Sequence, residues 1–77
     1  MATRKGRGDP DGAIADFTRA IELRPDYAEA YYFRGLAKRA KGDKDGAVAD
    51  FMKAIGLKPD YAEAKAQLRT VAGNPAR

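Results

Sequence analysis

The acidic residues include two short clusters whose carboxylates could, in principle, bind calcium. Asp9 and Asp11 precede a glycine, and Asp43 and Asp45 precede a second glycine with the same spacing. A calcium loop of the EF-hand type needs further oxygen ligands and a glutamate at its twelfth position, which neither cluster has. Aspartate is also a preferred residue at helix N-termini. We therefore predict that these aspartates cap helices rather than bind metal.

The sequence lacks the residue types that most enzymes use for acid–base and nucleophilic chemistry. It contains no histidine, cysteine or serine. The usual general base near neutral pH and the two commonest nucleophiles are therefore missing, as are the nitrogen and sulfur ligands of zinc sites. We expect a non-enzymatic protein with no catalytic residue, no metal site and no cofactor.

The composition points to one small soluble domain. The 77 residues include 15 basic and 11 acidic side chains, which gives a net charge of +4. No apolar segment approaches the roughly 20 residues that cross a bilayer, and the basic N-terminus lacks the apolar stretch of a secretory signal. We expect a cytoplasmic protein that does not bind membranes.

The chain contains an internal repeat with a period of 34 residues. The hexapeptide PDYAEA occurs at 25–30 and again at 59–64, and 17 of the 23 positions of segment 8–30 are identical in segment 42–64. A fixed period between about 20 and 50 residues is typical of stacked structural units that bury their apolar faces against one another.

Cap and turn residues divide the chain into four predicted helices. Asp26 and Glu29 match a capping box, in which each side chain accepts a hydrogen bond from the other residue's N–H, and Asp60 and Glu63 repeat the pattern. Gly42 fits the left-handed turn that ends a helix. The predicted domain, 9–73, holds helices at about 9–23, 27–41, 44–57 and 61–72, between a flexible basic segment 1–8 and a tail 74–77. Short connections make neighbouring helices antiparallel.

The repeat resembles the tetratricopeptide repeat family, whose pattern is W-x2-L-G-x2-Y, then A-x3-F, then P. The resemblance covers roughly residues 8–72, with one whole repeat at 28–61. The matching residues are Tyr31 in the Trp position, Gly35, Ala47, Phe51, Ala54 and Pro59. It implies an all-α fold in which antiparallel helical hairpins stack as a short solenoid.

Two departures from the family pattern lead to specific expectations. Arg34 and Lys38 occupy the Leu and Tyr positions that the family usually buries. Because an unpaired buried cation is costly, we predict that Arg34 pairs with Asp16 or Asp50. The last helix has Lys65 and Arg69 in the Trp and Gly positions, which is typical of a polar terminal helix.

The resemblance also implies a B-A-B-A order of helices, in which the first helix lacks its preceding A partner. We expect its apolar residues Ala13, Phe17 and Ala20 to form a self-association face. Two interpretations remain open. Either a second copy covers this face, giving a dimer by end-helix covering or helix exchange, or the chain is a fragment of a longer protein.

In the family, the A helices line a concave groove that binds peptides or a partner helix. The resemblance therefore implies a partner-binding groove made by the second and fourth helices. Its residues would be Glu29, Tyr32, Phe33, Leu36, Arg39, Glu63, Ala66, Gln67 and Thr70. We expect a protein-interaction module that docks a protein or peptide. The alternative that stays open is that Tyr32 and Phe33 pack between repeats or in a dimer.

Nucleic acid or another polyanion is the alternative partner. The N-terminal segment carries Arg4, Lys5 and Arg7, and three further cations line one side of the second helix. Basic tracts bind phosphates without sequence preference. However, acidic residues are interspersed, and no aromatic and basic platform for single strands is present, so we favour protein partners.

Overall fold

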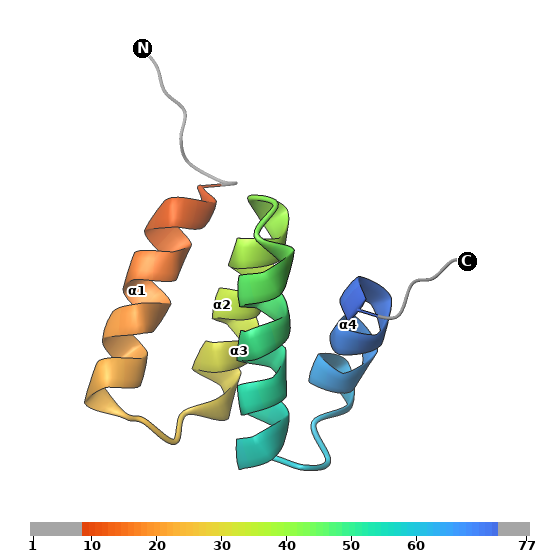
Figure 1. Ribbon diagram of the computed structural model, residues 1–77. Helices are drawn as coiled ribbons and strands as arrows, with labels where there is room; N and C mark the ends of the chain where they lie inside the picture. The colour runs from red at the N-terminus through yellow and green to blue at the C-terminus, as the bar shows by residue number, and fades with distance from the viewer. Residues whose placement is uncertain (1–8, 73–77) are drawn as a thin grey trace.

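The computed structural model describes residues 9–72, which form four α-helices. They are α1 (Pro10–Leu23), α2 (Ala28–Ala40), α3 (Lys44–Leu57) and α4 (Ala62–Ala72) (Figure 1). The predicted all-α fold is confirmed. The basic segment 1–8, Gly73 and the tail 74–77 lie outside the described residues.

Each helix packs against the next one along the chain, and successive helices run in opposite directions (Figure 1). The connections are only a few residues long, which forces this antiparallel arrangement. The N-terminal end of α1 therefore lies beside the C-terminal end of α2.

The two aspartate clusters cap helices, as predicted. The Asp9 side chain accepts a hydrogen bond from the Gly12 N–H at 3.3 Å, and the Asp43 side chain accepts one from the Gly46 N–H at 2.9 Å. Each bond satisfies an N–H group that has no partner within the first helical turn. The two copies of the repeat therefore begin their helices in the same way, at α1 and α3.

The capping box predicted at Asp26 is wrong. The residue at the N-cap of α2 is Tyr27, and no side chain caps this helix end. Asp26 instead lies in a turn closed by a 3.0 Å hydrogen bond from the Tyr27 N–H to the Arg24 carbonyl. This turn shifts the start of the helix by one residue. Glu29 then lies in the first turn of α2, where its negative charge interacts favourably with the helix dipole.

Two glycines are required by the backbone or by packing. Gly42, after α2, has φ of 94° and supplies the predicted left-handed turn. Gly35 lies where α2 approaches α3 closely, because a Cβ added there would be 2.7 Å from Cε1 of Phe51. The absence of a side chain at position 35 lets the Phe51 ring pack directly on the α2 backbone.

The core lies among α2, α3 and α4. Ala28, Ala54, Tyr61 and Ala64 form its buried cluster, and Phe51 is completely buried beside them. None of the residues of α1 is buried. The small alanines let the helices approach one another, and Phe51 is the largest fully buried side chain among residues 9–72. The described helices include none that is long and apolar enough to span a membrane.

Candidate functional site

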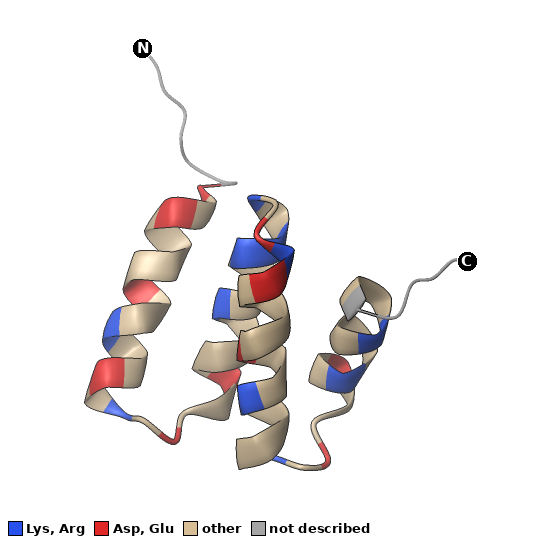
Figure 2. Cartoon of the chain, in the orientation of Figure 1, with Lys and Arg blue, Asp and Glu red and all other residues tan. Residues whose placement is uncertain are grey.

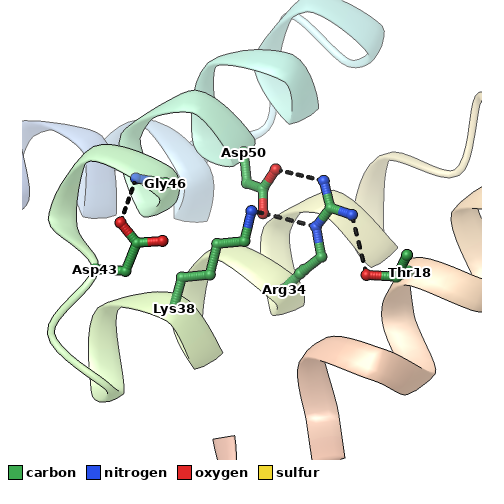
Figure 3. A network of polar contacts seen from close by, with 6 residues as sticks. All are labelled: Thr18, Arg34, Lys38, Asp43, Gly46 and Asp50. Carbon is green, nitrogen blue, oxygen red and sulfur yellow. Dashed lines mark hydrogen bonds and ion pairs between the residues drawn. The ribbon is translucent and has the colours of Figure 1, made fainter. Parts of the chain in front are cut away.

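A buried carboxylate on α3 holds two cations of α2 (Figure 3). The Asp50 side chain is only 5% exposed and accepts two hydrogen bonds from Arg34, from Nε and Nη2, each 2.8 Å long. Lys38 Nζ lies 3.3 Å from Oδ2 of the same carboxylate. The predicted pairing of Arg34 is therefore confirmed, with Asp50 as the partner.

Arg34 also connects this ion pair to α1. Its Nη1 donates a 3.2 Å hydrogen bond to the Thr18 hydroxyl, so one guanidinium joins α1, α2 and α3 (Figure 3). The hydrogen bonds to Asp50 raise the pKa of Arg34 above its ordinary value. The guanidinium therefore stays charged at any pH at which the fold exists, and the two acceptors fix its orientation.

Residues at equivalent positions of the repeat, 34 residues apart, have very different exposure in α1 and α3. Ala47, Phe51 and Ala54 of α3 are completely buried, because α2 and α4 pack over them. Their counterparts in α1 are Ala13, Phe17 and Ala20, which are all partly exposed. Phe17 stacks on Phe33 of α2 with ring centroids 5.7 Å apart, so Phe33 covers one side of its ring.

The carboxylates related by the repeat differ in the same way. Asp50 is buried and holds Arg34 and Lys38, whereas Asp16 is exposed. Within residues 9–72, no cation forms an ion pair with Asp16. Asp16 lies three residues after Ala13 and four before Ala20, on one stripe of the helix. We call Ala13, Asp16, Phe17 and Ala20 the open α1 face.

A hollow of about 610 Å³ lies between the open α1 face and α2. We call it the α1–α2 hollow. Its lining residues are Asp9, Pro10, Gly12, Ala13, Asp16, Leu36, Ala37 and Ala40. The lining combines small apolar side chains with two carboxylates and includes no cation, which makes it a shallow acidic site.

A smaller hollow of about 300 Å³ lies at the end of α2 beside α4, and we call it the α2–α4 hollow. Its lining residues are Arg39, Gly42, Lys44, Thr70 and Val71. Arg39 Nη1 donates a hydrogen bond to the Gln67 side chain, so the two helices are joined at the edge of this hollow. Two cations and one hydroxyl give this site the opposite charge to the α1–α2 hollow.

The structure divides the residues predicted for the groove among several places. Arg39 and Thr70 line the α2–α4 hollow, Gln67 accepts a hydrogen bond from Arg39, and Glu63 and Ala66 are exposed on α4. Leu36 instead lines the α1–α2 hollow, and Phe33, 44% exposed, stacks on Phe17 of α1. Glu29 lies near Lys58, with a 3.7 Å ion pair.

Tyr32 contacts the aromatic residues of the core rather than either hollow. Its ring lies 5.9 Å from that of Phe51 and 5.1 Å from that of Tyr61, between ring centroids. The packing interpretation therefore accounts for this residue. Burial raises the pKa of the neighbouring Tyr61 phenol, since a low-polarity environment disfavours the phenolate.

The comparison with protein families identifies the repeat. A family model described as Tetratricopeptide repeat matches residues 4–62, which is most of the chain. The chain belongs to the tetratricopeptide repeat family. Tetratricopeptide repeats generally mediate protein–protein interaction. A search of curated proteins finds no match.

The basic stripe considered for nucleic acid is largely neutralised in this tetratricopeptide repeat. Arg34 and Lys38 both pair with Asp50, and Lys41 pairs with Asp11 at 2.7 Å. Figure 2 shows acidic and basic residues interspersed along the helices rather than gathered on one side. The basic segment 1–8 lies outside the described residues.

Sequence reasoning missed most of the residues that line the two hollows of this tetratricopeptide repeat. Ala37 and Ala40 line the α1–α2 hollow, and Val71 lines the α2–α4 hollow beside Lys44. Small or aliphatic residues give no chemical signal, and a single lysine does not mark a site. Asp16, which repeats Asp50 at a distance of 34 residues, was named only as a possible partner of Arg34 and not as a binding residue. Within residues 9–72, no cluster of three or more acidic side chains is arranged to hold a metal ion.

Proposed function

We propose that the chain is a non-enzymatic protein-interaction module that holds a segment of another polypeptide on its uncovered surfaces. One observation carries this proposal. Ala13, Phe17 and Ala20 repeat three fully buried residues of α3, yet they are partly exposed in α1. Apolar surface that one copy of a repeat buries and the other leaves accessible is available to a partner.

The α2–α4 hollow is the second surface in the proposal. Arg39 and Thr70, two of the residues expected in the groove, line this hollow beside Lys44, and a third, Gln67, accepts a hydrogen bond from Arg39. Two cations and several hydrogen-bonding groups suit a peptide that carries a carboxylate. The remaining groove residues do not contribute to this hollow, so the docking surface that we propose is shorter than the one that the family resemblance implies.

A displayed random-peptide library panned on the whole chain tests the proposal. Ala13→Glu places a charge on the floor of the α1–α2 hollow, and Thr70→Glu does so in the α2–α4 hollow. We expect each enriched peptide to lose at least about tenfold in affinity on one of these variants. The larger side chain at position 13 occupies the α1–α2 hollow, and the carboxylate at position 70 pairs with the cations that a peptide carboxylate would use.

Ala15→Glu is the matched control, since Ala15 is exposed and lines neither hollow. It should leave the affinities unchanged. Peptides that bind all three variants equally, or a failure to enrich any peptide, would contradict the proposal.

Self-association through the open α1 face stays a prediction that can be tested separately. Size-exclusion chromatography with light scattering gives the mass directly. If a second copy covers the face, micromolar samples should have about twice the 8.3 kDa mass of the chain, and Ala13→Glu should restore the monomer. A monomer for the unmodified chain would reject self-association and leave docking of other polypeptides in place.

A further inference from the structure

We propose that the open α1 face binds an α-helix of a different polypeptide that carries the sequence Arg-Gly-x-x-Lys, and that Asp16 selects this helix through its arginine and lysine. The inference rests on the proposed function and names the partner of one of its two surfaces. The protein itself contains the template, because α2 covers the repeat-related face of α3.

The charges of the template define what Asp16 would bind. Asp50 receives two 2.8 Å hydrogen bonds from Arg34 and lies 3.3 Å from Lys38 Nζ. The two cations are four residues apart, so they lie on the same side of α2. Asp16 occupies the repeat-related position but has no such cations beside it within residues 9–72. A helix with the same spacing would supply both partners.

The glycine of the partner sequence follows from packing at Phe51. A Cβ on Gly35 would lie 2.7 Å from the Phe51 ring, so the helix that covers this ring must have glycine next to its arginine. Phe17 is the repeat-related ring on α1 and is partly exposed. A partner helix with a larger residue at this position would be held away from Phe17 and would lose the contact between its arginine and Asp16.

The α1–α2 hollow lies where the long cationic side chains of such a helix would enter. In the second copy of the repeat, the Lys38 side chain fills the equivalent space beside Gly46, where an added Cβ would be 3.0 Å from Lys38 Cδ. Around α1 that space is the hollow of about 610 Å³, with Gly12 in its wall. Its two carboxylates and lack of lining cations favour a basic occupant.

A second copy of this chain is a poor occupant. Its α2 carries the required sequence, but Arg34 and Lys38 are already held by Asp50 of the same chain. Each copy has two faces that such a helix could cover, on α1 and on α3, but only α2 has the required sequence. If α2 of one copy moved to α1 of another, it would leave its own α3 uncovered. In α4 the positions of Arg34 and Gly35 are taken by Leu68 and Arg69, which remove the arginine and add bulk against Phe17. A second copy of this chain is therefore not the occupant that we propose.

Titration of the whole chain with a synthetic helix tests this inference. The probe is a fluorescently labelled peptide with the sequence of residues 26–41, which contains Arg34, Gly35 and Lys38. We expect saturable binding, measured by fluorescence anisotropy. In the chain, Asp16→Asn should weaken binding about tenfold, because a hydrogen-bonded ion pair at the interface is lost.

Matched substitutions separate the ion pair from general charge. Glu22→Gln removes the same charge from another exposed position of α1 and should change the affinity by less than about twofold. In the peptide, Arg34→Gln should reproduce the loss of affinity. Arg39→Gln should not, because in α2 the Arg39 side chain faces Gln67 of α4 and not the carboxylate of α3. Circular dichroism confirms that each chain variant is folded.

Three outcomes would overturn the inference. If the peptide does not bind, the open α1 face does not accept this helix. If the peptide binds but Asp16→Asn has no effect, Asp16 does not select the partner, and the docking function itself survives. Asp16→Asn would also have no effect if the peptide bound by displacing α2 from α3, and that outcome likewise contradicts selection by Asp16. A dimer of the unmodified chain that Ala13→Glu disrupts would assign the face to a second copy instead.

Discussion

Phe51→Ala should lower the free energy of unfolding by about 3–5 kcal/mol, the range typical of a buried aromatic residue replaced by alanine. Phe51 is completely buried, packs directly on the α2 backbone at Gly35 and contacts Tyr32. Its removal leaves a cavity between α2 and α3. Because a domain of this size has only a few kcal/mol of stability, the variant should be largely unfolded at 25 °C, which urea titration followed by circular dichroism would measure.

The matched control is Phe17→Ala, at the repeat-related position of α1. Phe17 is partly exposed and stacks on the exposed Phe33. Less of its surface is removed from water on folding, so we expect a loss of about 1–2 kcal/mol. Equal losses at the two positions would show that the open α1 face is covered in solution, by a second copy or by residues outside the described part of the chain.

Asp50→Asn should lower the free energy of unfolding by about 2–3 kcal/mol. Breaking a buried ion pair from one side typically costs about 3–5 kcal/mol, because the remaining charge loses its compensation. The estimate is reduced because Arg34 and Lys38 keep 17% and 22% of their side-chain surface exposed. The Asn side chain keeps the shape of the carboxylate, so the measured loss reports charge rather than packing.

Asp16→Asn provides the comparison for Asp50→Asn. Asp16 is exposed, and substitutions at such positions usually change stability by less than about 0.5 kcal/mol. Urea titrations at two salt concentrations would measure the free energy of unfolding of both variants and show the difference between the two positions. A small effect at Asp50, or a large one at Asp16, would mean that Arg34 is not held on α3 as the structure describes.

The repeat made much of the fold predictable. Asp9, Asp43 and Gly42 act at helix ends by local hydrogen bonding and backbone geometry, which a short sequence determines. The pairing of Arg34 could be narrowed to Asp16 or Asp50 because the repeat placed both at equivalent positions. The sequence could not decide between them, because the partner of Arg34 depends on which side of α2 faces α3.

The candidate site was less predictable because it depends on long-range packing. Assigning a groove to α2 and α4 ignored α1, which contacts Phe33 and leaves Leu36 beside the α1–α2 hollow. Tyr32 was expected in the groove, but its ring is turned toward Phe51 and Tyr61. The orientation of a helix about its own axis decides which residues are accessible, and hydrophobic periodicity gives this only approximately.

The Asp26 error has a local cause. The sequence of a capping box was present, but the turn between Arg24 and Tyr27 is closed by backbone hydrogen bonding, and the helix starts one residue later. A pattern of four residues predicts where a helix begins to within a residue or two. It does not determine which of two adjacent residues becomes the N-cap.

The central claim is that the open α1 face lacks only a helix like α2. The claim can be tested with a longer chain in which a copy of residues 26–41 replaces residues 1–7 and is joined directly to Gly8. This junction is suitable because Gly8 and Asp9 have the same residue types as Gly42 and Asp43, which follow α2. The measurement is the free energy of unfolding of both chains, with and without Asp16→Asn. We predict that Asp16→Asn, nearly neutral in the original chain, costs about 2–3 kcal/mol in the extended one. An equally small cost in both chains would contradict the claim.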